Sequence, residues 1–155
     1  RRRRRLTKRG ISPASFTVLI EHVSPAHQYS ARGVFNAPDG ASTPGAALPG
    51  AAYSFSFAAD PGSRLSFATM FVQSNDLFYA PASTGIALWD ASGTPISGDL
   101  TDMIQLWDAG SEVNQAPRQA GADNGAAENG VVQLVNDGFS YPANNSIVRV
   151  TITQN

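Results

Sequence analysis

The chain has 155 residues, enough for one domain with a hydrophobic core. It contains no cysteine, which excludes a disulfide scaffold and thiolate metal sites. The printed sequence has no run of about 18 apolar residues, so it offers no candidate transmembrane helix. Fourteen glycines and ten prolines separate short apolar runs, a pattern that favours strands and turns over helices.

The net charge of −1 hides an uneven distribution. Residues 1–9 hold seven of the eleven basic residues, and the rest of the chain has four basic against twelve acidic residues, a net charge of −8. We therefore expect a basic disordered tail at 1–14 and a folded, acidic domain at 15–155. The tail is open to interpretation as an anion-binding arm, the remains of an export signal, or a solvated extension. An acidic body does not look like a nucleic-acid binder.

The first half of the domain alternates in the manner of strands. Residues 16–23 predict a first strand and residues 52–59 another. Between them, three prolines and three glycines predict a loop over 37–50. The sequence DPGS at 60–63 predicts a type II hairpin turn, because proline suits its second position and glycine its third.

The stretch at 65–81 organises the chain. Residues 65–72 predict a central strand packed on two sides, because both of its faces are nearly apolar. The polar sequence QSND at 73–76 then delivers Asp76 to the rim of the fold, immediately before the aromatic group at 77–79.

Further strands are predicted at 85–90, 103–107, 130–135 and 146–153. The strand at 103–107 breaks into a loop that carries Asp108 and Glu112. Long aperiodic segments such as 108–130 are often functional. The apolar runs and turns together predict an antiparallel β-sandwich of about eight strands.

Several motifs resemble the spondin domain, the N-terminal module of the F-spondin and mindin proteins that also occurs in secreted bacterial proteins. They are SNDLF at 74–78, IALWD at 86–90, WDAGSE at 107–112, FTVLIEHVSP at 16–25 and FSYPANNSIVRVTI at 139–152. The resemblance covers residues 15–153. It implies a C2-like antiparallel β-sandwich that binds calcium and serves adhesion or recognition. Vertebrate members carry cysteines, so their absence here favours a bacterial-type relative.

The resemblance also implies a metal site. Asp76 and Asp108 would bind calcium through their side chains, and Val72 through its backbone carbonyl. Glu112 replaces an acid at the end of the family's Asp-Ala-Gly-Thr-Asp motif and is a further candidate. Animal spondin domains place another Glu ligand on the preceding strand, whereas residues 52–59 contain no acid. Taken without the resemblance, the same acids are better interpreted as ordinary turn or capping residues.

The predicted function is a secreted or cell-surface calcium-binding module, which adheres to or recognises an extracellular protein or glycan without catalysis. One alternative is a structural surface or matrix protein that self-associates through strand edges. Another is a small glycoside hydrolase that uses paired carboxylates. The chain has no Gly-x-Ser-x-Gly motif and no P-loop, and neither His22 nor His27 lies in a catalytic motif.

Two further groups of residues are weaker candidates. Asp90, Asp99 and Asp102 fit a second cation site or ordinary turn acids, and Asp123 and Glu128 carry the same ambiguity. Aromatic residues near the acidic loops would suit a sugar platform, with core packing as the alternative. They are Trp89, Trp107, Phe78 and Tyr79, of which Tyr79 is expected to be the most exposed because Ala80 and Pro81 should end its strand.

The charge distribution yields a first prediction. Any nucleic-acid binding by the full chain should come from the basic tail, so deletion of residues 1–10 should abolish it at every salt concentration. Filter binding or fluorescence anisotropy with a DNA duplex measures this. Affinity that survives the deletion would show that the acidic body binds nucleic acid after all.

Overall fold

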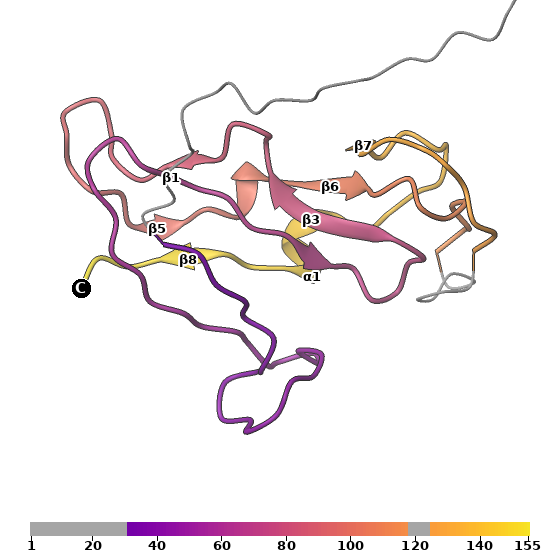
Figure 1. Cartoon of the computed structure of the whole chain (residues 1–155), viewed down its shortest axis with the longest axis horizontal. Helices are drawn as coiled ribbons and strands as arrows, with labels where there is room; N and C mark the ends of the chain where they lie inside the picture. Colours follow the sequence, from indigo (N-terminus) through magenta and orange to yellow (C-terminus); the bar gives the residue numbers. More distant parts are fainter. Residues whose placement is uncertain (1–30, 118–124) are drawn as a thin grey trace, which may run out of the picture.

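The computed structural model describes residues 31–117 and 125–155 (Figure 1). The predicted strand at 16–23, the tail at 1–14, and both histidines, His22 and His27, lie outside the described residues. What is described is an all-β arrangement in which every strand pair is antiparallel, as the sequence predicts.

A four-stranded sheet forms the centre of the fold (Figure 1). Its order is β2 (Thr69–Met70), β3 (Leu77–Pro81), β6 (Ile104–Asp108) and β7 (Gln133–Leu134). The five-residue strands β3 and β6 pair along their whole length, from Leu77 opposite Asp108 to Pro81 opposite Ile104. This register places the start of β3 and the end of β6 at the same end of the sheet.

Two smaller sheets and two short helical turns complete the described structure. One sheet pairs β1 (Arg64–Leu65) with β4 (Ile86–Ala87), and the other pairs β5 (Gly98–Asp99) with β8 (Thr151–Ile152). The turns are η1 (Thr101–Met103) and α1 (Asn144–Ile147). Within 31–117 and 125–155, no helix has the length and apolar character needed to span a bilayer. The division into two sheets of a sandwich stays a prediction.

The hydrophobic core draws side chains from all three sheets. Its buried members are Phe71, Leu77, Tyr79, Ile86, Leu100 and Ile104, with half-buried residues such as Leu65, Leu106 and Ile152 packed against them. Because these side chains lie on different sheets, the core holds the short ladders together. Burial of each large apolar side chain contributes about 1.5–3 kcal/mol to folding.

The turn at 60–63 is confirmed, but its hairpin is not. Ser63 donates its N–H to the Asp60 carbonyl at 3.0 Å, and Gly62 has a φ of 88°. The predicted strand at 52–59 was wrong, since these residues form no ladder in the described structure. Phe55 is half exposed, so the apolar face that suggested a buried strand is only partly covered.

The central strand predicted at 65–72 is also wrong as a continuous element. Its residues alternate between half-buried and exposed, and Phe71 is buried, which confirms one apolar face. Met70 and Val72, on the other face, are exposed. The chain changes partner within this stretch, because β1 pairs with β4 whereas β2 pairs with β3. A single central strand therefore does not form.

Two later strands are shorter than predicted. Of residues 85–90, only β4 pairs as a strand, and Trp89 adds an isolated bridge to Pro95. The segment predicted to begin its strand at 146 starts instead with α1. The Asn144 side chain donates to the Ile104 carbonyl at 2.7 Å, which fixes this turn against β6. The strand at 103–107 is confirmed by β6, shifted by one residue, whereas only Gln133–Leu134 of the strand predicted at 130–135 pair, as β7.

The prediction that Tyr79 is exposed was wrong, since only 2% of its surface is accessible. Its ring packs against Phe71 at a centroid distance of 5.5 Å. The strand does not break just after Tyr79, since β3 continues to Pro81. A proline has no N–H to donate, so it loses no hydrogen bond on a side where the strand has no partner. The register of β3 points the nitrogen of Pro81 away from β6, to the side where β2 has already ended.

Tyr79 yields a stability prediction. Its hydroxyl is buried without a hydrogen-bond partner, and burial raises the pKa of Tyr79 to about 12. Between the unfolded pKa of about 10 and the folded value, the unfolded state binds fewer protons, so stability falls as pH rises. We expect Tyr79→Phe to weaken this alkaline loss and to be neutral or stabilising by about 1 kcal/mol at pH 7. Urea unfolding at several pH values measures both. A clear destabilisation at pH 7 would contradict the buried, unpaired hydroxyl.

Candidate metal centre

A tight loop joins β2 to β3 and folds inward on itself. Phe71 donates its N–H to the Leu77 carbonyl at 2.9 Å, which closes the loop. Ser74, only 2% exposed, accepts from the Leu77 N–H at 3.1 Å and donates through its hydroxyl to the Phe71 carbonyl. The Ser74 hydroxyl thus forms hydrogen bonds with the backbone at both ends of the loop. The next two residues, Asn75 and Asp76, are buried as a result.

Asp76 is a buried acid that is hydrogen-bonded to a distant part of the chain. It is 6% exposed, and its Oδ2 accepts three hydrogen bonds from the loop after β6. The donors are the Ser111 N–H at 2.7 Å, the Ser111 hydroxyl at 2.9 Å and the Glu112 N–H at 2.9 Å. The other carboxylate oxygen, Oδ1, is buried and has no partner. Such an oxygen normally binds a donor, a water or a cation.

Asp108 lies at the same end of the sheet, because the register places it opposite Leu77. It is 4% exposed. Its Oδ1 accepts from the Gly110 N–H at 2.7 Å, and its Oδ2 accepts from the Asn114 side-chain amide at 2.8 Å. The two acidic loops therefore meet, as the sequence predicts. The hydrogen-bond donors to both carboxylates come from the loop after β6.

The loop that wraps these acids is backed by a second segment. Glu128 and Gly130 donate to the carbonyls of Ser111 and Gly110, and Val113 donates to the Ala126 carbonyl. Glu112 bridges to Ala127, and its carboxylate accepts from the Gly125 N–H at 2.9 Å. The Glu112 carboxylate therefore fixes the return of the chain, and Glu112 contacts Asp76 through its backbone N–H.

Asn75 was missed by the sequence prediction. Its side-chain amide donates to the Val113 carbonyl at 2.9 Å, while its Oδ1 is buried and unpartnered, like that of Asp76. In the sequence, only its position beside Asp76 in SNDLF could have suggested a role as a ligand. An asparagine that merely forms a turn would occupy the same position. Val72 lies at the start of the loop, with an exposed side chain.

These residues fit a cation in part. Calcium takes about six to eight oxygens, from carboxylates, carbonyls and waters. The free Oδ1 atoms of Asp76 and Asn75 are buried oxygens of the right chemistry. Among the described residues, however, no three His, Cys, Asp or Glu side chains gather as they would around a metal ion. The residues present thus suit a site with few carboxylates.

The weaker acidic candidates are mostly turn acids. Asp90 accepts from Ser92 and Thr94, and these hydrogen bonds, that of the Ser92 side chain first, lower its pKa. Asp99 accepts from the Thr101 N–H, and hydrogen bonds from Thr101 lower its pKa. Asp102 is exposed at the edge of a small hollow beside α1. Asp123 lies outside the described residues.

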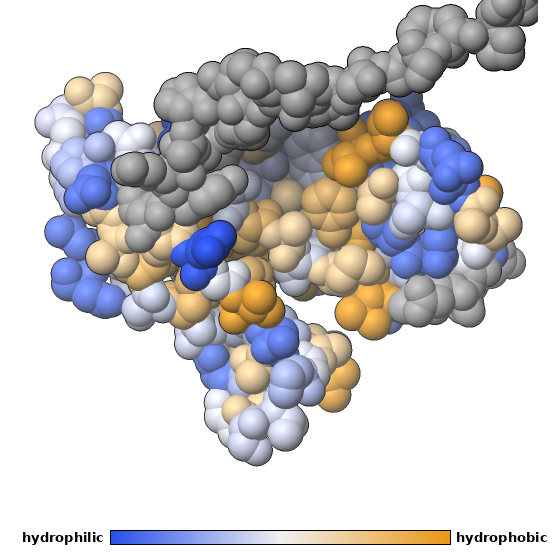
Figure 2. Space-filling model, in the orientation of Figure 1, coloured by the Kyte–Doolittle hydropathy of each residue, from blue (hydrophilic) through white to orange (hydrophobic). Residues whose placement is uncertain are grey.

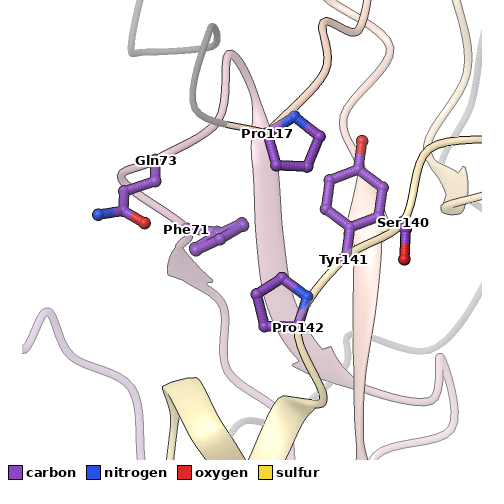
Figure 3. Close-up of a pocket in the computed structure, with 6 residues that line it drawn as sticks. All are labelled: Phe71, Gln73, Pro117, Ser140, Tyr141 and Pro142. Atoms are coloured by element: carbon purple, nitrogen blue, oxygen red, sulfur yellow. The ribbon is translucent and has the colours of Figure 1, made fainter.

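An open pocket of about 490 Å³ lies next to the Asp76 loop (Figure 3). Its lining combines rings with two polar side chains: Phe71, Gln73, Pro117, Ser140, Tyr141 and Pro142. The Tyr141 hydroxyl donates to Asp137 at 2.6 Å, and burial, followed by this hydrogen bond, raises the pKa of Tyr141. The aromatic residues predicted as a sugar platform do not line this pocket among the described residues. Trp107, for example, is half-buried and donates its indole N–H to the Ala80 carbonyl at 3.3 Å.

Comparisons with family models, with curated proteins and with solved structures found no match for this chain. The spondin resemblance therefore stays a prediction that rests on the motifs themselves.

Gly110 yields a prediction about the architecture of the centre. Its φ is 69°, and a Cβ there would lie 2.8 Å from backbone atoms of Gly130 and Val131. Gly93 has a similar φ of 81° but open space around it. Both alanine variants should lose about 1–2 kcal/mol from the left-handed backbone, and Gly110→Ala should lose more because of the contact. Chemical denaturation measures the difference. Equal losses would mean that the loops do not pack this closely.

Proposed function

We propose that this protein is a secreted, calcium-binding β module that serves adhesion or extracellular ligand recognition and is not an enzyme. The observation that carries the calcium proposal is the buried, unpartnered Oδ1 of Asp76 at the point where two acidic loops meet. Secretion and the extracellular ligand rest on the resemblance of the SNDLF and WDAGSE motifs to spondin domains.

In this proposal, Asp76 and Asp108 share one calcium ion, with the Val72 carbonyl as a third ligand. Asn75 is added because its free Oδ1 is buried beside Asp76. Glu112 contributes indirectly, through the loop that it ties to Gly125. With two carboxylates and neutral oxygens, the site should bind more weakly and keep more water than a site with three or four acids. The ion would supply positive charge that joins the two loops.

The hydrogen bonds already present favour binding without large rearrangement. Ser111 and Glu112 hold Asp76 through its Oδ2, which leaves Oδ1 for the ion. Gly110 holds Asp108 from its own loop. Because both carboxylates are fixed by backbone amides, little conformational entropy remains to be lost when calcium binds.

The pocket beside this centre is the proposed surface for a protein or glycan ligand. Tyr141 and the two prolines offer ring faces, while Gln73 and Ser140 offer hydrogen-bonding groups (Figure 3). Phe71 connects the two features, because it lines the pocket and also closes the loop that carries Asp76. Calcium binding would therefore stabilise one wall of the pocket.

A non-catalytic role is favoured by the burial of the acids. Asp76 and Asp108 are 6% and 4% exposed, and each accepts hydrogen bonds from loop amides. A glycosidase pair has to reach both sides of a glycosidic bond. The described residues that line the pocket of Figure 3 include no carboxylate.

Calcium should raise the melting temperature of the wild-type protein, measured by scanning calorimetry in EDTA and in millimolar calcium. Binding to the native state adds about 2.7 kcal/mol of stability at a hundredfold excess over Kd. Asp76→Asn and Asp108→Asn should each remove most of this increment.

Glu112→Gln is the matched control and should keep most of the calcium-dependent increment. Comparing the increment, and not the melting temperature itself, separates metal binding from any loss of hydrogen bonds in the Asp variants. Titration calorimetry with calcium chloride provides an independent reading. A wild-type protein with no shift, or Asp variants that keep it, would rule out the shared site.

A further inference from the structure

Among the described residues, the edge strand β7 has little protection. It is the last strand of the four-stranded sheet, and its other side has no partner strand among the described residues. Natural proteins usually protect such edges with charged residues, prolines or covering segments. The sequence NGVVQLV at 129–135 contains no charge and no proline.

The side chains along this edge are apolar and exposed. Val131, Val132 and Leu134 are 72%, 61% and 46% exposed. Figure 2 shows apolar surface at the place where Figure 1 draws β7. Gly130 contacts Gly110, and Gln133 pairs with Asp108. Two residues on this edge, Val131 and Val132, therefore lie opposite a single residue, Ala109, of the neighbouring chain segment. This bulge turns both valines toward solvent.

Within 31–117 and 125–155, no backbone partner is found for the outward groups of this edge. Consecutive residues of an antiparallel strand point their N–H and C=O groups to opposite sides. Val135 donates to the Leu106 carbonyl at 3.2 Å, so the N–H and C=O of Leu134 point to the open side. Gln133 pairs with Asp108 toward the sheet, which directs the Val132 carbonyl outward as well.

We propose that β7 pairs with β7 of a second copy of this chain, antiparallel about a twofold axis at Gln133. The Leu134 N–H of each copy then meets the Val132 carbonyl of the other, and the central sheet becomes an eight-stranded sheet across the dimer. An isologous contact needs a self-complementary surface, and this edge supplies matched donors and acceptors between apolar side chains.

The charge distribution favours a second copy at this edge over the other acidic surfaces. Outside residues 1–9 the chain carries a net charge of −8, so most faces of two copies repel each other. The edge at 129–135 has no charge, and like-charge repulsion is smallest there. The dimer does not depend on the proposed calcium site.

Sedimentation equilibrium of the full chain tests the proposal, at concentrations from about 1 µM to about 1 mM. The buffer should contain EDTA, so that the result is independent of calcium. It should also contain about 1 M NaCl, where a Debye length of about 3 Å suppresses attraction between the basic tail and the acidic body. We expect the average mass to rise twofold toward that of a dimer.

Two variants should block the contact in different ways. Val132→Glu places like charges near the axis, and Leu134→Pro removes the outward N–H without a loss to the β6 ladder. Each should raise the dissociation constant at least tenfold. Met70→Glu is the control, because Met70 is 54% exposed on β2, the opposite edge of the same sheet. It should leave association unchanged.

Other outcomes would overturn the proposal. A wild-type protein that stays monomeric to the highest concentration has no such contact. Association that survives Val132→Glu, or that Met70→Glu abolishes, uses another surface. Masses beyond the dimer would indicate an open, heterologous contact and not a twofold one. Circular dichroism checks the folding of Leu134→Pro, and Val132→Glu alone decides the result if that variant is unfolded.

Discussion

The three hydrogen bonds that Asp76 accepts from Ser111 and Glu112 are the contact on which the described structure most depends. They join the β2–β3 loop to the loop after β6, two segments about 35 residues apart in the chain. A buried carboxylate without donors would be costly, and here backbone amides supply most of the compensation. The same loop after β6 also bonds residues 126–130 through Gly110, Ser111 and Val113, and these residues lead into β7. One loop therefore contacts both the candidate site and the segment before the edge strand.

Glycine makes that arrangement possible. Gly110 and Gly130 approach so closely that a side chain on either would collide with the backbone of the other. The Gly110 N–H then reaches Asp108, and the Gly130 N–H reaches the Gly110 carbonyl. The second contact requires the two segments to lie nearer than side chains normally allow. The polar centre is thus held by backbone, which varies less in position than long side chains do.

Sequence reasoning predicted the parts that depend on local chemistry. Proline and glycine predicted the turn at 60–63, and the motifs shared with spondin domains predicted that the loops carrying Asp76 and Asp108 would meet. It failed where partner strands decide the outcome. Tyr79 was expected in solvent, because the pattern could not tell that Pro81 would face a side of the ladder without a partner. It also missed Asn75, since a ligand asparagine and a turn asparagine look alike in sequence.

The loop at 36–50 has a practical consequence. It projects from the body of the molecule in Figure 1, and nearly all of its residues are exposed. Its ends are already closed, because Asp39 donates to the Ala52 carbonyl at 2.8 Å and the Tyr53 hydroxyl contacts both Gly45 and Ala47. Lengthening a loop that is closed in this way costs only about 0.6 kcal/mol for each doubling. The segment between Gly40 and Gly45 is therefore a suitable place to graft a foreign peptide for display.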